Sequence, residues 1–546
     1  MKVMRKALFN VLTASLILSS SPASSTTAAR AQSAAPPGPV AAPAVPSDRK
    51  AYLDANRISD SKKKIEALQK FMTDFPKSSM LFNAHISLMN TLIKNAPEQK
   101  EDILLHAQKA IDAAPEFARK SVCNQVASGL IEANILLDKA EEFAARALAI
   151  AEEEQAKSMR QSRAAYQTMI GRIELKKGKT KDAEKAFQAA YDAIPPADAN
   201  PTRRTAALGL AEIAEKEGKY DQALPYLAIG AISGPMDAAA RARLETAYKK
   251  THKDSAEGLE EMLDALYEKE SPSPIKVEAY KPTASRTDRT VLSEVFTGAG
   301  CPPCVGADLA FDAFLERYRN KDVIVMMYHQ HIPLPDPMTN PSSLARAKYY
   351  GVRGVPSFAI DGDSSNSGGG SRSMALEVYD RLSPFIEKQL ENPSEAEIKL
   401  SADVDGRVVK VTANVASVKR EAGEFKLQVA LVEESLRFTG ENGIRFHPMV
   451  VRSLAGANAG GFALDRSKLA PIEWRFDLNA ITEELKSHLD EFEKGRSDDH
   501  YTFAEKKHAI NPANLSVVAF VQDDKTKQVL QTVTLKVGAR QTVSTR

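Results

Sequence analysis

The sequence predicts a multidomain chain: an α-helical repeat solenoid, then an α/β unit, then a mostly-β sandwich. Three observations predict this order. Residues 48–270 combine helical periodicity with recurring small residues. Residues 286–392 alternate apolar strand-like runs with helical runs, and residues 393–546 change to the two-residue period of strands. At 546 residues, several domains are expected.

The N-terminal residues have the pattern of a secretory signal peptide. Three basic residues precede an apolar run over residues 7–18, which is too short to span a membrane, and small residues follow. We therefore expect a cleavable signal peptide over residues 1–31 and a periplasmic or secreted mature protein. Residues 32–47 are rich in proline and alanine, which predicts an extended linker.

The helical stretch contains a recurring motif. Residues 178–190 and residues 218–226 place a glycine, a small residue and an aromatic residue at similar offsets. This pattern resembles tetratricopeptide-type helix pairs, which stack into a solenoid. Such an array is either a spacer or dimerising scaffold, or a concave surface that selects a protein partner, and the fold alone does not choose. Residues 271–285 contain three prolines and predict a linker.

A C-x-x-C motif follows the first strand-like run of the α/β unit. The run over residues 290–296 leads through a glycine-rich turn to Cys301, at the start of a helix predicted over residues 305–319. Free backbone N–H groups and the helix dipole favour the thiolate form of Cys301, which is a nucleophile. Cys304, one turn later, can form a disulfide with Cys301 or resolve a mixed disulfide. The same spacing also occurs in half of a zinc site and in structural turns.

A second motif makes the interpretation specific. Residues 350–362 contain Pro356 at the start of an apolar strand that ends in an Asp-Gly turn. Together with the C-x-x-C motif, this segment resembles the thioredoxin superfamily over residues 286–392. The resemblance implies that a cis peptide bond precedes Pro356, that this proline faces the disulfide, and that Val355 pairs its backbone with the substrate chain.

Two positions depart from the thioredoxin pattern. Gly300 stands where thioredoxins have a tryptophan, and Val295 stands where many of them have a buried acid. The neighbouring Glu294 should point to the other face of the strand, because successive side chains alternate. The sequence therefore does not identify a proton shuttle.

Two histidines, His329 and His331, follow a strand predicted over residues 321–328. With Cys301 and Cys304 they would supply the two sulfur and two nitrogen donors that suit tetrahedral zinc. Residues two apart on an extended chain point to opposite faces, so we expect no metal site. The alternatives are a histidine that modulates the thiol and one that is merely hydrogen-bonded.

The Gly- and Ser-rich residues 362–373 predict a flexible loop. A phosphate cradle is the alternative, but the lysine-hydroxyl ending of a P-loop is missing.

Composition excludes several classes of function. The 73 basic and 71 acidic residues leave no charge excess that would suggest nucleic acid as a partner. Three cysteines are too few for a disulfide scaffold, and two of them form the C-x-x-C motif. The third, Cys123, lies in a helical run, where a buried apolar thiol is favoured over a third redox partner.

The C-terminal part alternates like strands and is interrupted by a predicted helix over residues 478–494. An antiparallel sandwich of immunoglobulin type is the expected arrangement, on strand count alone. Residues 442–448 form either a structural turn or a functional loop near the redox motif. The predicted strands are residues 395–404, 407–415, 424–432, 448–454, 516–522 and 529–537, with a hairpin between the last two.

These patterns predict an enzyme, an extracytoplasmic thiol–disulfide oxidoreductase that acts on protein disulfides without a cofactor. Cys301 attacks, Cys304 resolves, and Val355 with Pro356 positions the substrate backbone. The expected partners are protein dithiols or disulfides, a membrane or periplasmic electron donor, and a protein or second copy bound by the helical repeats. The alternative is a non-enzymatic binding or scaffold protein in which the disulfide is structural.

The direction of electron flow is predicted to be reducing or isomerising rather than oxidising. Pro302 and Pro303, between the two cysteines, have no N–H group to donate to a thiolate. Strongly oxidising proteins stabilise the thiolate of their reduced form, and the two prolines of this motif supply no hydrogen bond that would do so. A charged His329 or His331 beside Cys301 would reverse this expectation.

Overall fold

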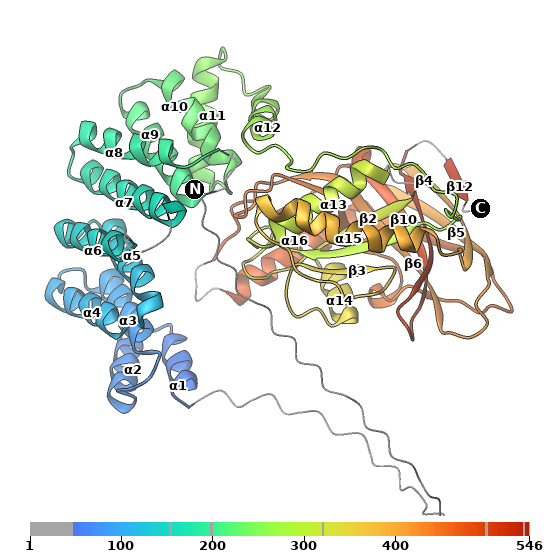
Figure 1. Cartoon of the computed structure of the whole chain (residues 1–546), viewed down its shortest axis with the longest axis horizontal. Coiled ribbons are helices and arrows are strands. Elements are labelled where there is room, and N and C mark those ends of the chain that lie inside the picture. Colours follow the sequence, from blue (N-terminus) through green and yellow to red (C-terminus); the bar gives the residue numbers. More distant parts are fainter. Residues whose placement is uncertain are drawn as a thin grey trace, which may run out of the picture.

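The computed structural model describes residues 47–151, 156–196, 200–318, 322–496, 501–538 and 541–544. The predicted signal peptide and nearly all of the predicted linker therefore lie outside the described residues. Within the described ranges, no helix is both long enough and apolar enough to cross a membrane. Figure 1 shows a stack of helices in the N-terminal part and a body rich in strands in the C-terminal part.

The helical region is an array in which each helix packs against its neighbours in sequence. Recurring glycines let these helices approach closely. A Cβ at Gly171 or Gly209 would lie 2.6 Å from ring carbons of Phe187, so this ring fills the space between two helices that only glycine leaves open. The helices are α1 (Ser47–Asn56), α2 (Ser61–Asp74), α3 (Leu81–Asn95), α4 (Lys100–Ala113), α5 (Glu116–Ala133), α6 (Leu137–Ala151), α7 (Ala156–Lys176), α8 (Thr180–Ala193), α9 (Pro201–Lys216), α10 (Tyr220–Ile232), α11 (Ala238–Thr251) and α12 (Leu259–Glu270).

The α/β unit follows as a strand, a helix, a strand, a helix, a strand and a helix. The second strand pairs with the first in parallel, and the third pairs with the first antiparallel. The strands predicted over residues 290–296 and 321–328 and the helix predicted over residues 305–319 are present, with ends shifted by one or two residues. The elements are β1 (Val291–Thr297), α13 (Cys304–Tyr318), β2 (Val323–His329), α14 (Pro341–Tyr350), β3 (Ser357–Ile360) and α15 (Ala375–Leu390).

The C-terminal strands do not form a separate sandwich, and this prediction was wrong. Four of them continue the sheet of the α/β unit in the order β11-β10-β6-β7-β2-β1-β3, with β8 paired to β6. The junction is a parallel pairing of β7 with β2, which an antiparallel immunoglobulin-type sandwich does not contain. The C-terminal strands of this long sheet are β6 (Phe425–Arg437), β7 (Phe446–Leu454), β8 (Phe462–Ala463), β10 (Leu515–Asp523) and β11 (Val529–Lys536).

A second, four-stranded sheet packs on part of the long sheet. Its order is β12-β4-β5-β9, and the predicted helical insertion, α16 (Leu478–Gly495), follows β9. Its strands are β4 (Ala396–Asp405), β5 (Val408–Val418), β9 (Ile472–Asp477) and β12 (Gln541–Ser544). The apolar core between the two sheets includes Leu400, Val411, Leu427, Val429, Val517 and Ala519. Two packed sheets are therefore present, but one of them belongs equally to the α/β unit.

One face of the long sheet is covered by two different layers. Helices α13 and α15 cover its β1–β3 end, and the four-stranded sheet covers its β6–β10–β11 end. Helix α14 packs on the opposite face. The long sheet is thus buried on both faces, so its inner strands are apolar almost throughout.

A buried ion pair joins the α/β unit to the C-terminal strands. Glu294 of β1 points to the α14 face, as alternation predicted, and accepts from Arg346 at 2.6 and 2.8 Å. Tyr328 and Tyr350 also donate to this carboxylate, at 2.9 and 2.7 Å. Arg346 donates in addition to Gln522 of β10 at 2.8 Å. These contacts stabilise the position of β10 relative to β1.

Candidate functional site

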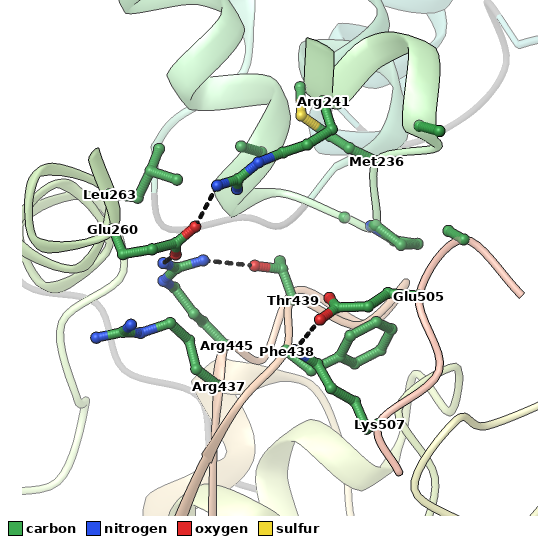
Figure 2. Close-up of a pocket in the computed structure, with 15 residues that line it drawn as sticks. Met236, Arg241, Glu260, Leu263, Arg437, Phe438, Thr439, Arg445, Glu505 and Lys507 are labelled. Atoms are coloured by element: carbon green, nitrogen blue, oxygen red, sulfur yellow. Dashed lines mark hydrogen bonds and ion pairs between the residues drawn. The ribbon is translucent and has the colours of Figure 1, made fainter. Parts of the chain in front are cut away.

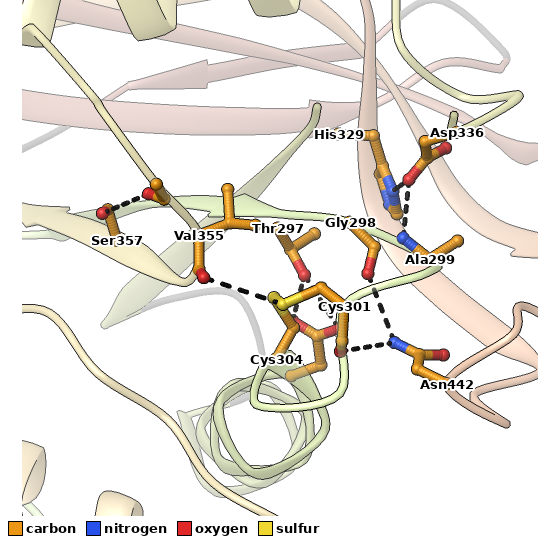
Figure 3. Close-up of a disulfide and its surroundings, with 12 residues drawn as sticks. Thr297, Gly298, Ala299, Cys301, Cys304, His329, Asp336, Val355, Ser357 and Asn442 are labelled. Carbon is orange, nitrogen blue, oxygen red and sulfur yellow. Dashed lines mark hydrogen bonds and ion pairs between the residues drawn. A yellow bond between two sulfur atoms is a disulfide. The ribbon is translucent and has the colours of Figure 1, made fainter. Parts of the chain in front are cut away.

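Cys301 and Cys304 form a disulfide at the start of α13, with the two sulfur atoms 2.05 Å apart (Figure 3). The helix begins at Cys304, and the backbone N–H of Cys304 donates to the carbonyl of Cys301 at 3.2 Å. Cys301 therefore lies in the turn that leads into the helix, where the helix dipole acts on it. Both residues are buried, Cys301 with an exposed fraction of 1%.

The peptide bond between Val355 and Pro356 is cis, as the thioredoxin resemblance implied. The carbonyl of Val355 points at the disulfide, and its oxygen lies 3.7 Å from the sulfur of Cys301 (Figure 3). The structure thus brings the four predicted site residues together.

The Gly-rich loop, residues 362–373, packs on this turn instead of extending away from it. The N–H of Gly370 donates to the carbonyl of Pro303 at 2.7 Å, and Gly306 donates to the carbonyl of Gly370 at 2.8 Å. A Cβ at Gly369 would lie 2.0 Å from the Pro303 oxygen. The glycines are needed because backbone packs directly on backbone, which composition alone could not indicate.

Asp308 is a buried acid of α13 that was not predicted as a site residue. It lies one helical turn after Cys304 on α13, and the hydroxyl of Thr297 donates to its carboxyl oxygens at 2.8 and 3.0 Å. Burial raises the pKa of Asp308 to about 7, although the hydrogen bond from Thr297 opposes this. A carboxyl group that titrates near neutral pH is suited to exchange protons with a thiol. The sequence feature that could have indicated this residue is an aspartate four positions after Cys304 in an apolar helical run.

His329 and Asp336 form a buried pair beside the turn that precedes Cys301. Asp336 accepts from the Nδ1 of His329 at 2.8 Å and from the N–H of Ala299 at 2.7 Å (Figure 3). Burial would raise the pKa of Asp336, but His329 and the hydrogen bonds keep it below its usual value. This pair therefore fixes the turn at Ala299.

His331 also contacts Asp336, because its Nδ1 accepts from the backbone N–H of Asp336 at 3.0 Å. Its ring stacks on Phe492 of α16, with ring centres 3.8 Å apart. Burial lowers the pKa of His331 to about 4, so this histidine is neutral at pH 7. Among the described residues, no group of three or more His, Cys, Asp or Glu side chains could bind a metal ion.

The connection between β6 and β7 also reaches the disulfide turn. Asn442 donates through Nδ2 to the carbonyls of Gly298 and Cys301, at 3.3 and 3.4 Å (Figure 3). The first of residues 442–448 thus contacts the turn that contains Cys301, and a function of this segment stays a prediction. His447 is buried behind it, with its Nε2 2.9 Å from the carbonyl oxygen of Phe438, and burial lowers its pKa to about 3.

Two remaining residues of interest have packing explanations. A Cβ at Gly300 would lie 2.7 Å from the Cβ of Leu334, so the loop after β2 leaves no room for a side chain at this position. Cys123 is a free thiol buried in α5, and burial raises its pKa. The interpretation of Cys123 as a buried apolar thiol is confirmed.

Comparison with known proteins identifies no family. No protein-family model matches the sequence, and a search of curated proteins finds no match. Among solved structures, the chain is similar to HBP35 of Porphyromonas gingivalis, at 15% identity and a TM-score of 0.32, over 46% of this chain and 75% of that chain. It is similar to BtubC of P. vanneervenii, at 14% identity and a TM-score of 0.29, over 43% of this chain and 98% of that chain.

A further similar structure is a thermophilic TPR protein of Thermus thermophilus, at 16% identity and a TM-score of 0.24, over 37% of this chain and 99% of that chain. At these identities and TM-scores, we transfer no function from these proteins to this chain.

Proposed function

We propose that this protein is an extracytoplasmic thiol–disulfide oxidoreductase of thioredoxin type, which acts on protein disulfides. The thiolate of Cys301 attacks a substrate disulfide, forms a mixed disulfide and releases one substrate thiolate. The thiolate of Cys304 then attacks the sulfur of Cys301, which releases the second substrate thiolate and leaves the Cys301–Cys304 disulfide. Two electrons pass to the substrate, and a separate donor must return two electrons to the protein.

The observation that carries this proposal is the position of the Val355 carbonyl, 3.7 Å from the Cys301 sulfur. A disulfide that only stabilises a fold needs no backbone carbonyl directed at it. An extended substrate chain that pairs with the backbone of Val355 would have its own disulfide beside Cys301. Asp308, with a pKa near 7, is suited to take the proton of Cys304 as this residue becomes a nucleophile.

A reducing or isomerising direction is favoured over an oxidising one. Pro302 and Pro303 donate no hydrogen bond to a Cys301 thiolate. His331 and His447, with pKa values lowered to about 4 and about 3 by burial, are neutral at pH 7 and supply no cation. Pro302, Pro303, His331 and His447 therefore supply neither a hydrogen bond nor a positive charge of the kind that stabilises the thiolate in strong oxidants.

The test is the reduction of insulin disulfides by the full-length protein, with dithiothreitol as the electron donor. We expect turnover above the uncatalysed rate, loss of turnover in Cys301→Ser, and an accumulated mixed disulfide in Cys304→Ser. Pro356→Ala should impair turnover without unfolding the helical region. Turnover that is equal in the native protein and in Cys301→Ser would contradict the proposal.

A non-enzymatic scaffold is the second candidate, and burial of the disulfide favours it. Cys301 is 1% exposed and Cys304 fully buried, as expected for a structural disulfide. In this case the helical array would bind a protein partner or a second copy, and the disulfide would only stabilise the turn. Such a disulfide should resist reduction by glutathione, which distinguishes the two candidates.

A further inference from the structure

The β6–β7 hairpin, residues 438–445, covers the turn that contains Cys301. The backbone N–H of Asn442 donates to the carbonyl of Ala299 at 3.0 Å, and its side chain donates to the carbonyls of Gly298 and Cys301. A Cβ at Gly440 would lie 2.3 Å from the Ala299 oxygen, so the two backbones are in direct contact. The hairpin tip thus holds the backbone of the turn that contains Cys301.

The base of the same hairpin is attached to α12, the last helix of the helical array. Arg445 is buried and donates to Asp264 at 2.8 Å and to Glu260 at 2.7 Å. Arg241 of α11 also pairs with Glu260, at 2.6 Å, and Arg437 also pairs with Asp264. Figure 2 shows Arg241, Glu260 and Arg445 meeting between the array and the hairpin. Two carboxylates of α12 therefore anchor arginines of the hairpin.

This attachment combines ion pairs with a cavity. The cavity, of about 490 Å³, lies between the hairpin and α10, α11 and α12, and its lining includes Met236, Leu263 and Phe438 (Figure 2). Beside it, the rings of Tyr267 and Phe446 are in contact, with centres 5.6 Å apart. Ion pairs beside a cavity can separate with less loss of packing than a filled core allows.

The end of α12 also contacts the Gly-rich loop, residues 362–373, which packs on the turn that contains the disulfide. Arg372 donates to the hydroxyl of Tyr267 at 3.2 Å and to the carbonyl of Ser271 at 3.1 Å. Arg372 lies near the end of the Gly-rich loop, in which the N–H of Gly370 donates to the carbonyl of Pro303. Helix α12 is thus connected to both segments that flank the disulfide.

We propose that the β6–β7 hairpin holds the Cys301 turn in place through its ion pairs to α12, and that Asn442 is a positioning residue for this turn. This inference rests on the proposed redox function of the disulfide. A displacement of the hairpin frees the backbone of the turn, so that the disulfide is reduced more readily. The helical array therefore governs the reduction of the disulfide through α12.

The test is the rate at which dithiothreitol reduces the disulfide of the full-length oxidised protein, followed by alkylation and mass analysis. Asn442→Ala removes the contact at the hairpin tip, and Asp264→Asn weakens the ion pairs at its base. We expect each to react about fivefold faster than the native protein, since one hydrogen bond contributes about 1 kcal/mol. Glu215→Gln, which breaks an ion pair with Arg243 inside the array, should leave the rate unchanged.

The outcomes separate this proposal from the proposed function. Unchanged rates in both variants, with thermal unfolding showing that they are folded, would overturn the proposal that the hairpin holds the turn. Acceleration in Asn442→Ala but not in Asp264→Asn would overturn the control by the array. Neither result depends on insulin turnover, because excess dithiothreitol attacks the disulfide whether or not the protein is an enzyme.

Discussion

The two ends of the long sheet are both buried, but they bury different kinds of residue. At the β6–β10–β11 end, the buried residues that face the second sheet are apolar, and they form one continuous core. At the β1–β3 end, the disulfide lies beside buried titratable groups, Asp308, His329 and Asp336. Burial of such groups is unfavourable unless they are paired, so their presence indicates a site and not a core.

The largest effect is expected where the two ends are joined. Arg346→Met removes the partner of Glu294 and leaves a buried carboxylate unpaired, which should cost about 3–5 kcal/mol of unfolding free energy. Urea unfolding measures this loss. The exposed pair of Lys410 with Asp405 is the control, and Lys410→Met should change stability by less than about 1 kcal/mol. Equal effects would show that the buried pair does not join the two ends.

The pH dependence of stability tests the polar end. The folded pKa of Asp308, about 7, lies above its ordinary value of 3.8, so the stabilisation by this group is complete below about pH 4 and is lost as pH rises to about 7. Asp308→Asn does not titrate. Its stability relative to the native protein should therefore rise between pH 4 and pH 7, by up to roughly 4 kcal/mol. A difference that is independent of pH would mean that Asp308 has an ordinary pKa.

A substitution at the apolar end should affect stability alone. Leu427→Ala opens a cavity in the core between the two sheets and should cost about 2–5 kcal/mol in urea unfolding. The rate of disulfide reduction by dithiothreitol should stay that of the native protein. A changed rate would show that the two ends are coupled and that the apolar end does more than stabilise the fold.

The smallest expected effect is a difference in labelling among the three cysteines. In the reduced protein at mildly acidic pH, iodoacetamide should modify Cys301 before Cys304, because Cys301 lies beyond the helix N-terminus. Cys123 should react last, since burial raises its pKa. Mass analysis of the labelled peptides decides the order, and preferential labelling of Cys304 would exchange the two roles.

The sequence predicted local elements better than their partners. The strand predicted over residues 516–522 is β10, Leu515–Asp523, but this strand is buried on both faces, so its pattern could not indicate which sheet it joins. The C-x-x-C motif and the segment around Pro356 could be recognised in the sequence because the residues of each motif lie close together in the chain. Asp308 was missed as a site residue, and residues 442–448 were left open between a structural turn and a functional loop. Only the fold brings Asp308 and Asn442 to this part of the molecule, and an Asp or Asn alone has many uses.

The most direct test of the account is the equilibrium reduction potential of the Cys301–Cys304 disulfide in a glutathione redox buffer. A reducing oxidoreductase predicts a value near that of thioredoxin, about −270 mV. A value below about −300 mV would identify a structural disulfide and contradict the proposed function. A value near −120 mV, that of the strongest oxidants, would contradict the predicted direction of electron flow.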